Sequence, residues 1–361
     1  MKQLKEVFFS RKQFQVIADQ LGQVHPGLNK KRFLHQVTAG LDQLELKQRI
    51  VRAAETCHDH LRRRYPKALQ VLYDLSAIIS PGFSYMFMPD FVARYGLRYY
   101  DISIKALADF TPYSSSELAI RVFLENDFDN TIAVMHKWAE SDDYHVRRLA
   151  SEGSRPRLPW ATRVASLLEK PGHALGILEA LKADEEKYVQ KSVANHINDI
   201  SKDYPEWVLD LVEEWDKKNN NTAWIIRHGL RSLVKRGYPR VFPLLGFEEV
   251  SRVDLEGLSL EREELHLGDS LSFVAKLQSR STKDQRLVVD YKIHYMKING
   301  TSRGKVFKLK NIILKAGDMV ELPKSHKLKN FSTRKHYPGR HLLEVLVNGE
   351  TLGIREFRLF V

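Results

Sequence analysis

The sequence predicts a two-domain protein, in which an all-α solenoid of HEAT-like helical repeats is followed by an all-β immunoglobulin-like sandwich. Two patterns along the 361 residues support this division. Up to about residue 245, apolar residues recur at three- and four-residue spacing, as in amphipathic helices. From about residue 248, apolar and polar residues alternate, as in strands. We therefore assign a helical repeat domain to residues 1–247 and the sandwich to residues 248–361.

Gly, Pro, Asn and Ser residues divide the helical part, because they favour turns and helix ends. The breaks separate candidate helices at residues 10–22, 29–40, 43–63, 65–79, 88–94, 99–109, 115–125, 129–139, 142–152, 160–168, 172–181, 186–201, 204–215, 221–235 and 239–244. Strand-like alternation is nearly absent from this region. An apolar content of 43% is enough to build a real core in each domain.

The later helices repeat. An aromatic residue before a β-branched residue, followed by a basic one, recurs in YHVRRLASEG, YVQKSVANHINDIS and AWIIRHGLRSLVKRG. Matching Val146, Val189 and Ile225 gives spacings of 43 and 36 residues, near the period of HEAT-like helix pairs. The first helix of each pair is expected in FDNTIAVMHKWAE, GHALGILEALKA and YPEWVLDLVEEWDK. Stacked pairs of this kind form a solenoid with a concave binding surface.

The second domain is predicted from its strands and turns alone, since it has no cysteine pair. Alternation in LSFVAKLQS, QRLVVDYKIHYMKI, GKVFKLKNIIL, HLLEVLVNG and GIREFRLFV predicts roughly seven short strands in about 110 residues. Asn-Gly at residues 299–300 and 348–349 is typical of hairpin turns. This combination favours an immunoglobulin-like sandwich.

Positive charge is concentrated in the predicted sandwich. The whole chain has a formal charge of +12, whereas residues 271–340 alone hold 17 Lys and Arg against 4 Asp and Glu, a net charge of +13. Basic residues at alternating strand positions or in turns include Lys276, Arg280, Lys305, Lys308, Lys310, Arg334, Lys335 and Arg340. They can follow a phosphate backbone. Alternatively, lysines protect exposed strand edges from pairing, but so one-sided an excess favours phosphate contact.

One stretch, from Ser141 to Trp160, is predicted to be a helix with a defined start and end. Ser141 is expected as its N-cap, followed by two aspartates at the positive end of the helix dipole. Gly153 is expected to end the helix in the left-handed conformation. Pro156 and Pro159 then prevent further helix.

The end of this stretch gathers charge around a tryptophan. Arg148 and Glu152 are one turn apart on the helix, and the prolines are expected to hold Arg155 and Trp160 on an extended segment beside Glu152. We therefore expect these four residues on one exposed edge. Spacing alone favours a simpler role for Trp160, as an anchor that packs on the next helix.

Three carboxylates are candidates for chemistry. In the repeat register Glu152 corresponds to Asn195, and Asp199 lies one turn beyond Asn195 on the same face. Glu152 and Asp199 are therefore expected to lie on the outward-facing sides of neighbouring inner helices. Glu117 is expected at the start of the helix one pair earlier, in SSSELAIRVFL. Phosphates repel carboxylates, so acids on a concave, basic protein suit a ligand that carries positive charge.

Each carboxylate also has a purely structural explanation. Glu117 stands three residues after Ser114, which is the spacing of a capping box. Glu152 can pair with Arg148 as an exposed ion pair, worth about 0 to 1 kcal/mol. Asp199 can be one solvated charge among many.

Other site types are not indicated. The single Cys57 cannot form an internal disulfide or complete a zinc site, which favours a reducing compartment. In CHDH at residues 57–60, side chains two positions apart on a helix diverge, so no metal site is expected. Phosphate-binding glycine loops, the nucleophile elbow and HExxH are absent, as are apolar runs of signal-peptide or membrane-span length. We expect no metal, no cofactor, no membrane association and an intracellular location.

Three segments stand out together: DDYHVRRLASEGSRPRLPWA, SSSELAIRVFL upstream of it and VANHINDISKDYP downstream. They resemble the AlkC-like family of DNA alkylation repair glycosylases over most of the helical region. The basic β domain is similar to the immunoglobulin-like domain of some members. The resemblance implies a monofunctional glycosylase that removes the cationic bases 3-methyladenine and 3-methylcytosine from double-stranded DNA and leaves an abasic site.

The resemblance also implies roles for the candidate residues. The catalytic set would be the three carboxylates Glu117, Glu152 and Asp199, lining the site around the deoxyribose and the lesion. The residues that hold the DNA backbone and close the site would be Arg148, Arg155 and Trp160. Such carboxylates would stabilise the oxocarbenium-like sugar, and one of them would orient the attacking water.

The partner implied is alkylated duplex DNA, bound by a monomer in the bacterial cytoplasm or nucleoid. The alternative is a non-catalytic HEAT-repeat scaffold that binds nucleic acid or protein. A simple DNA-binding groove gains nothing from three acids, so the carboxylate set favours the enzyme.

Overall fold

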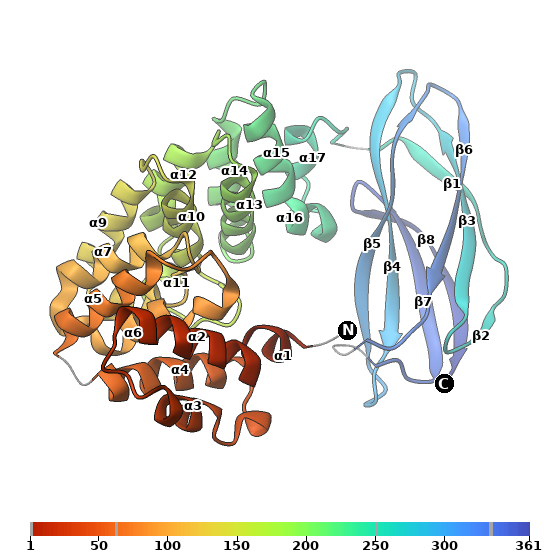
Figure 1. The fold of residues 1–361 in the computed structure, drawn as a ribbon. Coiled ribbons are helices and arrows are strands. Elements are labelled where there is room, and N and C mark those ends of the chain that lie inside the picture. The colour runs from red at the N-terminus through yellow and green to blue at the C-terminus, as the bar shows by residue number, and fades with distance from the viewer. Residues whose placement is uncertain (1–2, 62–63, 250, 332–334) are drawn as a thin grey trace. The chain divides into compact units, whose positions relative to one another are not determined.

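The computed structural model describes residues 3–61, 64–249, 251–331 and 335–361 (Figure 1). The chain forms two compact units, one of residues 1–203 and 215–229 and the other of residues 204–214 and 230–361. Three helices near the predicted domain junction thus group with the β domain, and the boundary at residue 247 stays a prediction. Arg334, expected to contact phosphate, lies outside the described residues.

The first unit is helical throughout the residues described. Its α-helices are α1 (Leu4–Phe8), α2 (Arg11–Val24), α3 (Lys30–Thr38), α4 (Leu46–Leu61), α5 (Tyr65–Ser76), α6 (Phe87–Tyr95), α7 (Tyr100–Phe110), α8 (Ile120–Asn126), α9 (Phe128–Trp138), α10 (Tyr144–Gly153), α11 (Ala165–Glu169), α12 (Leu175–Leu181), α13 (Lys187–Ile200) and α15 (Asn220–Gly229). Short 3₁₀ turns lie at Leu41–Gln43, Phe83–Tyr85, Leu97–Tyr99 and Pro171–Ala174.

The helices of this unit pack in the order that the repeats predict. Helix α9 packs on α10 and α12 packs on α13, as the two members of a pair should. The second helices then stack on one another, α10 on α13 and α13 on α15. The matched residues Val146, Val189 and Ile225 are all buried in these contacts. The predicted pairing is therefore confirmed for the first two pairs, in which each helix buries the apolar face that its sequence period provides. The third predicted pair is divided, because its first helix, in residues 204–214, belongs to the other unit.

The ends of α10 differ from the prediction. The N-cap is Asp143, whose carboxylate accepts a hydrogen bond from the backbone N–H of His145 at 2.7 Å; Ser141 instead accepts from the backbone N–H of Asp143. Gly153 is the last helical residue and does not adopt a positive φ. Its lack of a side chain serves packing, because a Cβ there would lie 2.6 Å from Cγ2 of Ile120.

The second unit joins three helices to a β-sandwich. Its helices are α14 (Pro205–Glu213), α16 (Arg231–Arg236) and α17 (Val241–Leu244). Its strands are β1 (Val253–Leu260), β2 (Glu264–His266), β3 (Ser270–Ser279), β4 (Gln285–Met296), β5 (Ser302–Leu314), β6 (Met319–Lys327), β7 (Gly339–Val347) and β8 (Glu350–Phe360). Ion pairs from Arg240 to Asp210 (2.8 Å) and Glu213 (3.0 Å) connect the segment before α17 to α14.

Two sheets face each other in the sandwich, with the orders β1-β3-β6 and β2-β8-β7-β4-β5 (Figure 1). All neighbouring strands are antiparallel except β2 and β8, which are parallel. The described strands are longer than expected, since β4 and β5 have 12 and 13 residues. The predicted Asn-Gly turns are confirmed, one between β4 and β5 and one between β7 and β8.

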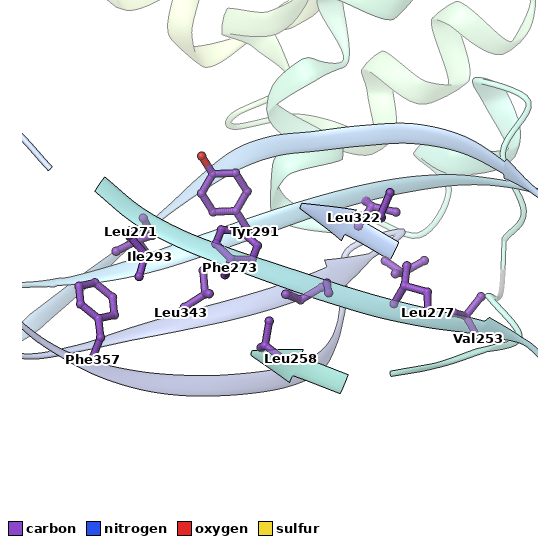
Figure 2. Packing of buried hydrophobic residues seen from close by; sticks show 14 of the residues in the cluster. Val253, Leu258, Leu271, Phe273, Leu277, Tyr291, Ile293, Leu322, Leu343 and Phe357 are labelled. Carbon is purple, nitrogen blue, oxygen red and sulfur yellow. The ribbon is translucent and has the colours of Figure 1, made fainter. Parts of the chain in front are cut away.

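Alternate residues of both sheets form the sandwich core. Figure 2 shows Leu258, Phe273 and Leu277 from the three-stranded sheet together with Ile293 and Leu343 from the five-stranded sheet. All five are at most 6% exposed. The outward positions between them remain free for charged side chains, which is how a strongly basic domain still folds around an apolar core.

Candidate active site

Five of the six predicted site residues lie in one chain of ion pairs. Arg148 Nη1 lies 2.5 Å from Glu117 Oε2, and Arg148 Nη2 lies 3.5 Å from Glu152 Oε1. Arg155 Nη1 donates to Glu152 Oε1 at 2.6 Å, and Arg155 Nε donates to Asp199 Oδ2 at 2.8 Å. Acids and arginines thus alternate along this chain, and they come from the turn before α8, from α10 and the loop after it, and from α13.

This chain is mostly buried, which corrects the expectation of an exposed edge. The side chains of Glu152 and Asp199 are 8% and 3% exposed, and those of Arg148 and Arg155 are 12% and 9% exposed. Asp199 is therefore not a solvated charge. The closest guanidinium to Glu152 belongs to Arg155 and not to Arg148. Since buried charges are costly without partners, the alternation of signs is what allows these groups to stay inside.

Glu117 lies outside a regular helix, in the turn that precedes α8. The expected capping box with Ser114 is absent, because Ser115 Oγ accepts from the backbone N–H of Glu117 instead, and Ser114 Oγ has no hydrogen-bond partner in the described chain. Ser115 Oγ also donates to Glu117 Oε2 at 3.0 Å and accepts from Arg148 Nη1 at 2.7 Å. At 21% exposure, Glu117 is the most accessible of the three carboxylates.

Three contacts to these groups were missed by the sequence reasoning. Ser192 of α13 donates its hydroxyl to Glu152 Oε2 at 2.6 Å, and Lys202 donates to Asp199 Oδ1 at 2.9 Å. The ring of Tyr188 lies 4.8 Å from the guanidinium carbon of Arg148. The available signal was helical spacing, because Tyr188, Ser192 and Asp199 fall near one face of α13 at intervals of four and seven residues.

Burial and neighbouring charges fix the protonation of the basic groups here. Burial opposes the charge of Arg155, but Glu152 and Asp199 outweigh this effect and raise its pKa above the ordinary value. His196 of α13 is fully buried, and burial, together with the cations Arg155 and Arg121, lowers its pKa to about 3. At neutral pH, Arg155 is thus charged and His196 is neutral.

Trp160 is neither an extended residue nor a buried anchor. Its backbone is left-handed, with φ 66°, and 57% of the residue is exposed. Its carbonyl accepts a hydrogen bond from Lys47 Nζ of α4. The residue borders a cavity of 270 Å³ whose wall also includes Ser115. Trp160 thus lines the same cavity as Ser115, which contacts both Glu117 and Arg148.

The arrangement suits the stabilisation of positive charge. The three carboxylates are balanced by Arg148, Arg155 and Lys202, so their oxygens are fixed in place without an excess of negative charge. Fixed carboxylates of this kind stabilise a cation that forms beside them without further reorganisation. Within the described ranges, no group of three His, Cys, Asp or Glu side chains is arranged to hold a metal ion. No helix there is long and apolar enough to span a membrane.

The basic residues of the β domain are only partly available to a ligand. Lys276 pairs with Glu321 at 2.6 Å, and Lys308 pairs with Asp290 at 3.2 Å. Arg280 and Arg340 also form ion pairs with carboxylates of neighbouring strands. Because lysine or arginine pairs on strands also serve the sheet itself, phosphate contact by these side chains stays a prediction.

Comparison with known proteins finds a family match within each part of the chain. Residues 114–233 match the family model described as "DNA alkylation repair enzyme", and residues 254–361 match "Uncharacterised protein YhaZ, C-terminal Ig-like domain". The chain is 37% identical to "Uncharacterized protein YhaZ" of Bacillus subtilis (strain 168), over 99% of this chain and 100% of that protein. It is 45% identical to Pseudomonas fluorescens alkylpurine DNA glycosylase AlkC, solved bound to DNA containing an abasic site analog, with a TM-score of 0.97 over 100% of both chains.

Proposed function

The chain belongs to the DNA alkylation repair enzyme family, together with the alkylpurine DNA glycosylase AlkC, and we propose that it is a monofunctional DNA glycosylase. Its substrates would be the cationic bases 3-methyladenine and 3-methylcytosine in duplex DNA. The enzyme hydrolyses the N-glycosidic bond of these bases and leaves an abasic site. We further propose that it acts as a monomer in the bacterial cytoplasm.

The observation that carries the proposal is the sharing of Arg155 between Glu152 and Asp199, at 2.6 and 2.8 Å, on two stacked inner helices. A DNA-binding groove without chemistry has no use for acids held so firmly, because they repel phosphates. A sugar that becomes positively charged as its bond breaks is stabilised by them.

The remaining roles follow from position. Glu117, the most exposed of the three acids, is the carboxylate best able to approach the deoxyribose. Glu152 or Asp199 orients the water that attacks the sugar. Arg148 and Arg155 hold these acids and offer cations to the DNA backbone, while the exposed Trp160 closes the site.

The same electrostatics explains a preference for charged lesions. An N3-methylated base already carries positive charge, so it leaves as a neutral molecule without strong general-acid help. A neutral base gains much less from fixed carboxylates. The proposed enzyme should therefore release 3-methyladenine and 3-methylcytosine far faster than neutral damaged bases.

A base-release assay tests this function. Methylated duplex DNA is incubated with the protein, and free bases and alkali-labile sites are measured. We expect release by the wild type and its loss in a Glu152→Gln, Asp199→Asn double variant. Glu140→Gln is the matched control, because Glu140 is an exposed acid of the same unit. Thermal unfolding of each variant checks that the fold survives.

The same assay separates the enzyme from a non-catalytic scaffold. A protein that binds methylated duplex but releases no base would support the scaffold. Release that persists unchanged in the folded double variant would reject the proposed role of these carboxylates.

A further inference from the structure

The segment between α10 and α11 is held by a buried arginine. This tryptophan loop, residues 154–162, carries both Arg155 and Trp160. Arg121 of α8 donates Nη1 to the carbonyls of Gly153 at 3.0 Å and Arg155 at 2.9 Å, and donates Nε to the carbonyl of Thr162 at 2.9 Å. The Arg121 side chain therefore forms hydrogen bonds with the backbone at both ends of the loop.

Arg121 is an unusual choice for a purely structural support. It is 1% exposed and forms no ion pair with a carboxylate in the described chain, although Glu125 acts on its charge from a longer distance. Its Nη2 also has no hydrogen-bond partner in that part of the chain. A buried cation without an acidic partner is costly, and an apolar side chain of similar size would avoid that cost. What Arg121 provides instead is a fixed set of donors that matches three carbonyls at the two ends of the tryptophan loop.

The middle of the loop is held from a different helix. Lys47 is an exposed residue of α4, and its ammonium donates to the carbonyl of Trp160. Trp160 is strained, because a residue with a side chain rarely adopts a φ of 66°. The residue is more than half exposed beside a cavity whose wall includes the apolar side chains of Ile50, Met86 and Leu118. Without a restraint, the backbone could relax and the indole could leave its exposed position.

We propose that Lys47 and Arg121 are positioning residues that hold the tryptophan loop, and with it the indole of Trp160, in the DNA-engaging geometry before DNA binds. The inference rests on the proposed function, because the duplex is what the exposed indole would meet. A loop that is already ordered loses less conformational entropy when it binds. The strain at Trp160 is maintained because contacts from two separate helices fix the surrounding backbone.

Lys47 provides the cleaner test, since an exposed side chain can be changed without loss of the fold. Lys47→Met keeps the aliphatic stem and removes the donor, Lys47→Arg restores a donor, and Lys67→Met controls for the loss of an exposed lysine elsewhere. We expect Lys47→Met to lower kcat/KM for base release on the order of tenfold, a loss of one hydrogen bond to a catalytic element. Lys47→Arg should recover most of that loss, and Lys67→Met should match the wild type.

Two further readouts distinguish positioning from simple phosphate contact. In a Trp160→Ala background, Lys47→Met should cause a much smaller additional loss, because the indole that it positions is gone. The salt dependence of duplex binding should keep its slope in Lys47→Met, whereas loss of a phosphate contact lowers the slope by about 0.9. A full additional loss in the Trp160→Ala background, or a reduced slope, would overturn the proposal.

A measurement without DNA keeps this inference separate from the proposed activity. The fluorescence anisotropy of Trp160 is obtained as the difference between each protein and its Trp160→Phe counterpart. We expect Lys47→Met, and Arg121→Lys if it folds, to lower this anisotropy in the free protein. Unchanged anisotropy in Lys47→Met would overturn the positioning role. Failure of the wild type to release any base would instead reject the glycosylase and leave the anisotropy result standing.

Discussion

His196 should make the stability of the helical unit depend on pH in a predictable direction. Its folded pKa is lowered from an ordinary 6.5 to about 3, so the unfolded chain binds the proton more readily. The contribution of neutral His196 to the free energy of unfolding is therefore fully present above pH 6.5 and is lost as the pH falls toward 3. From the difference of 3.5 between those two values, the full loss is about 5 kcal/mol, of which about 2 kcal/mol is lost by about pH 5. His196→Gln should remove this contribution.

Chemical denaturation of wild type and His196→Gln at about pH 8 and about pH 5, followed by helical circular dichroism, measures the effect. Other groups titrate in both proteins, so the difference between them isolates residue 196. We expect the wild type to lose about 2 kcal/mol more than the variant over this interval. Equal losses would refute the reasoning, because they would mean that position 196 is not neutral and buried beside Arg155.

Three other predictions concern Ser192, Gly153 and two lysines of β5. Ser192→Ala removes the hydroxyl that holds Glu152, and because a hydrogen bond to a charged group contributes about 1.5 to 3 kcal/mol, base release should slow by roughly 10- to 100-fold with little change in duplex affinity. Gly153→Ala places a methyl 2.6 Å from a side chain of α8 and should destabilise the protein by about 1 to 3 kcal/mol in denaturant titrations. Changing both Lys305 and Lys310 to Gln should reduce the salt slope of duplex binding by about 0.9 per lost phosphate contact, and an unchanged slope would show that neither lysine contacts phosphate.

The fold was readable from the sequence because it depends on repeated local patterns. Helical spacing of apolar residues placed α9, α10, α12 and α13, and the match of Val146 with Val189 placed the inner helices against each other. Alternation and the two Asn-Gly turns placed β3, β4, β5, β7 and β8, whereas β1, β2 and β6 were not among the predicted segments. Such patterns survive because each element must bury one face wherever it lies in the fold.

The ends of elements were predicted less well, because they depend on competition among neighbouring residues. Ser141, Asp142 and Asp143 are all residue types that cap helices, and in the structure Asp143 is the N-cap of α10. A glycine at position 153 predicts a helix end in the left-handed conformation. In the structure, its lack of a side chain matters because Ile120 of α8 leaves no room for a Cβ. Sequence spacing contains no information about such a contact.

The sequence by itself determined the helical and β parts, the repeat register and the identity of the candidate acids and arginines. The tertiary structure alone decided their partners. It placed Ser192 against Glu152, and it buried Arg155 between two carboxylates. Periodicity fixes the face of a helix on which a side chain lies, but hydrogen bonds and ion pairs form over about 3 Å. Only the packed positions of neighbouring helices set distances that short.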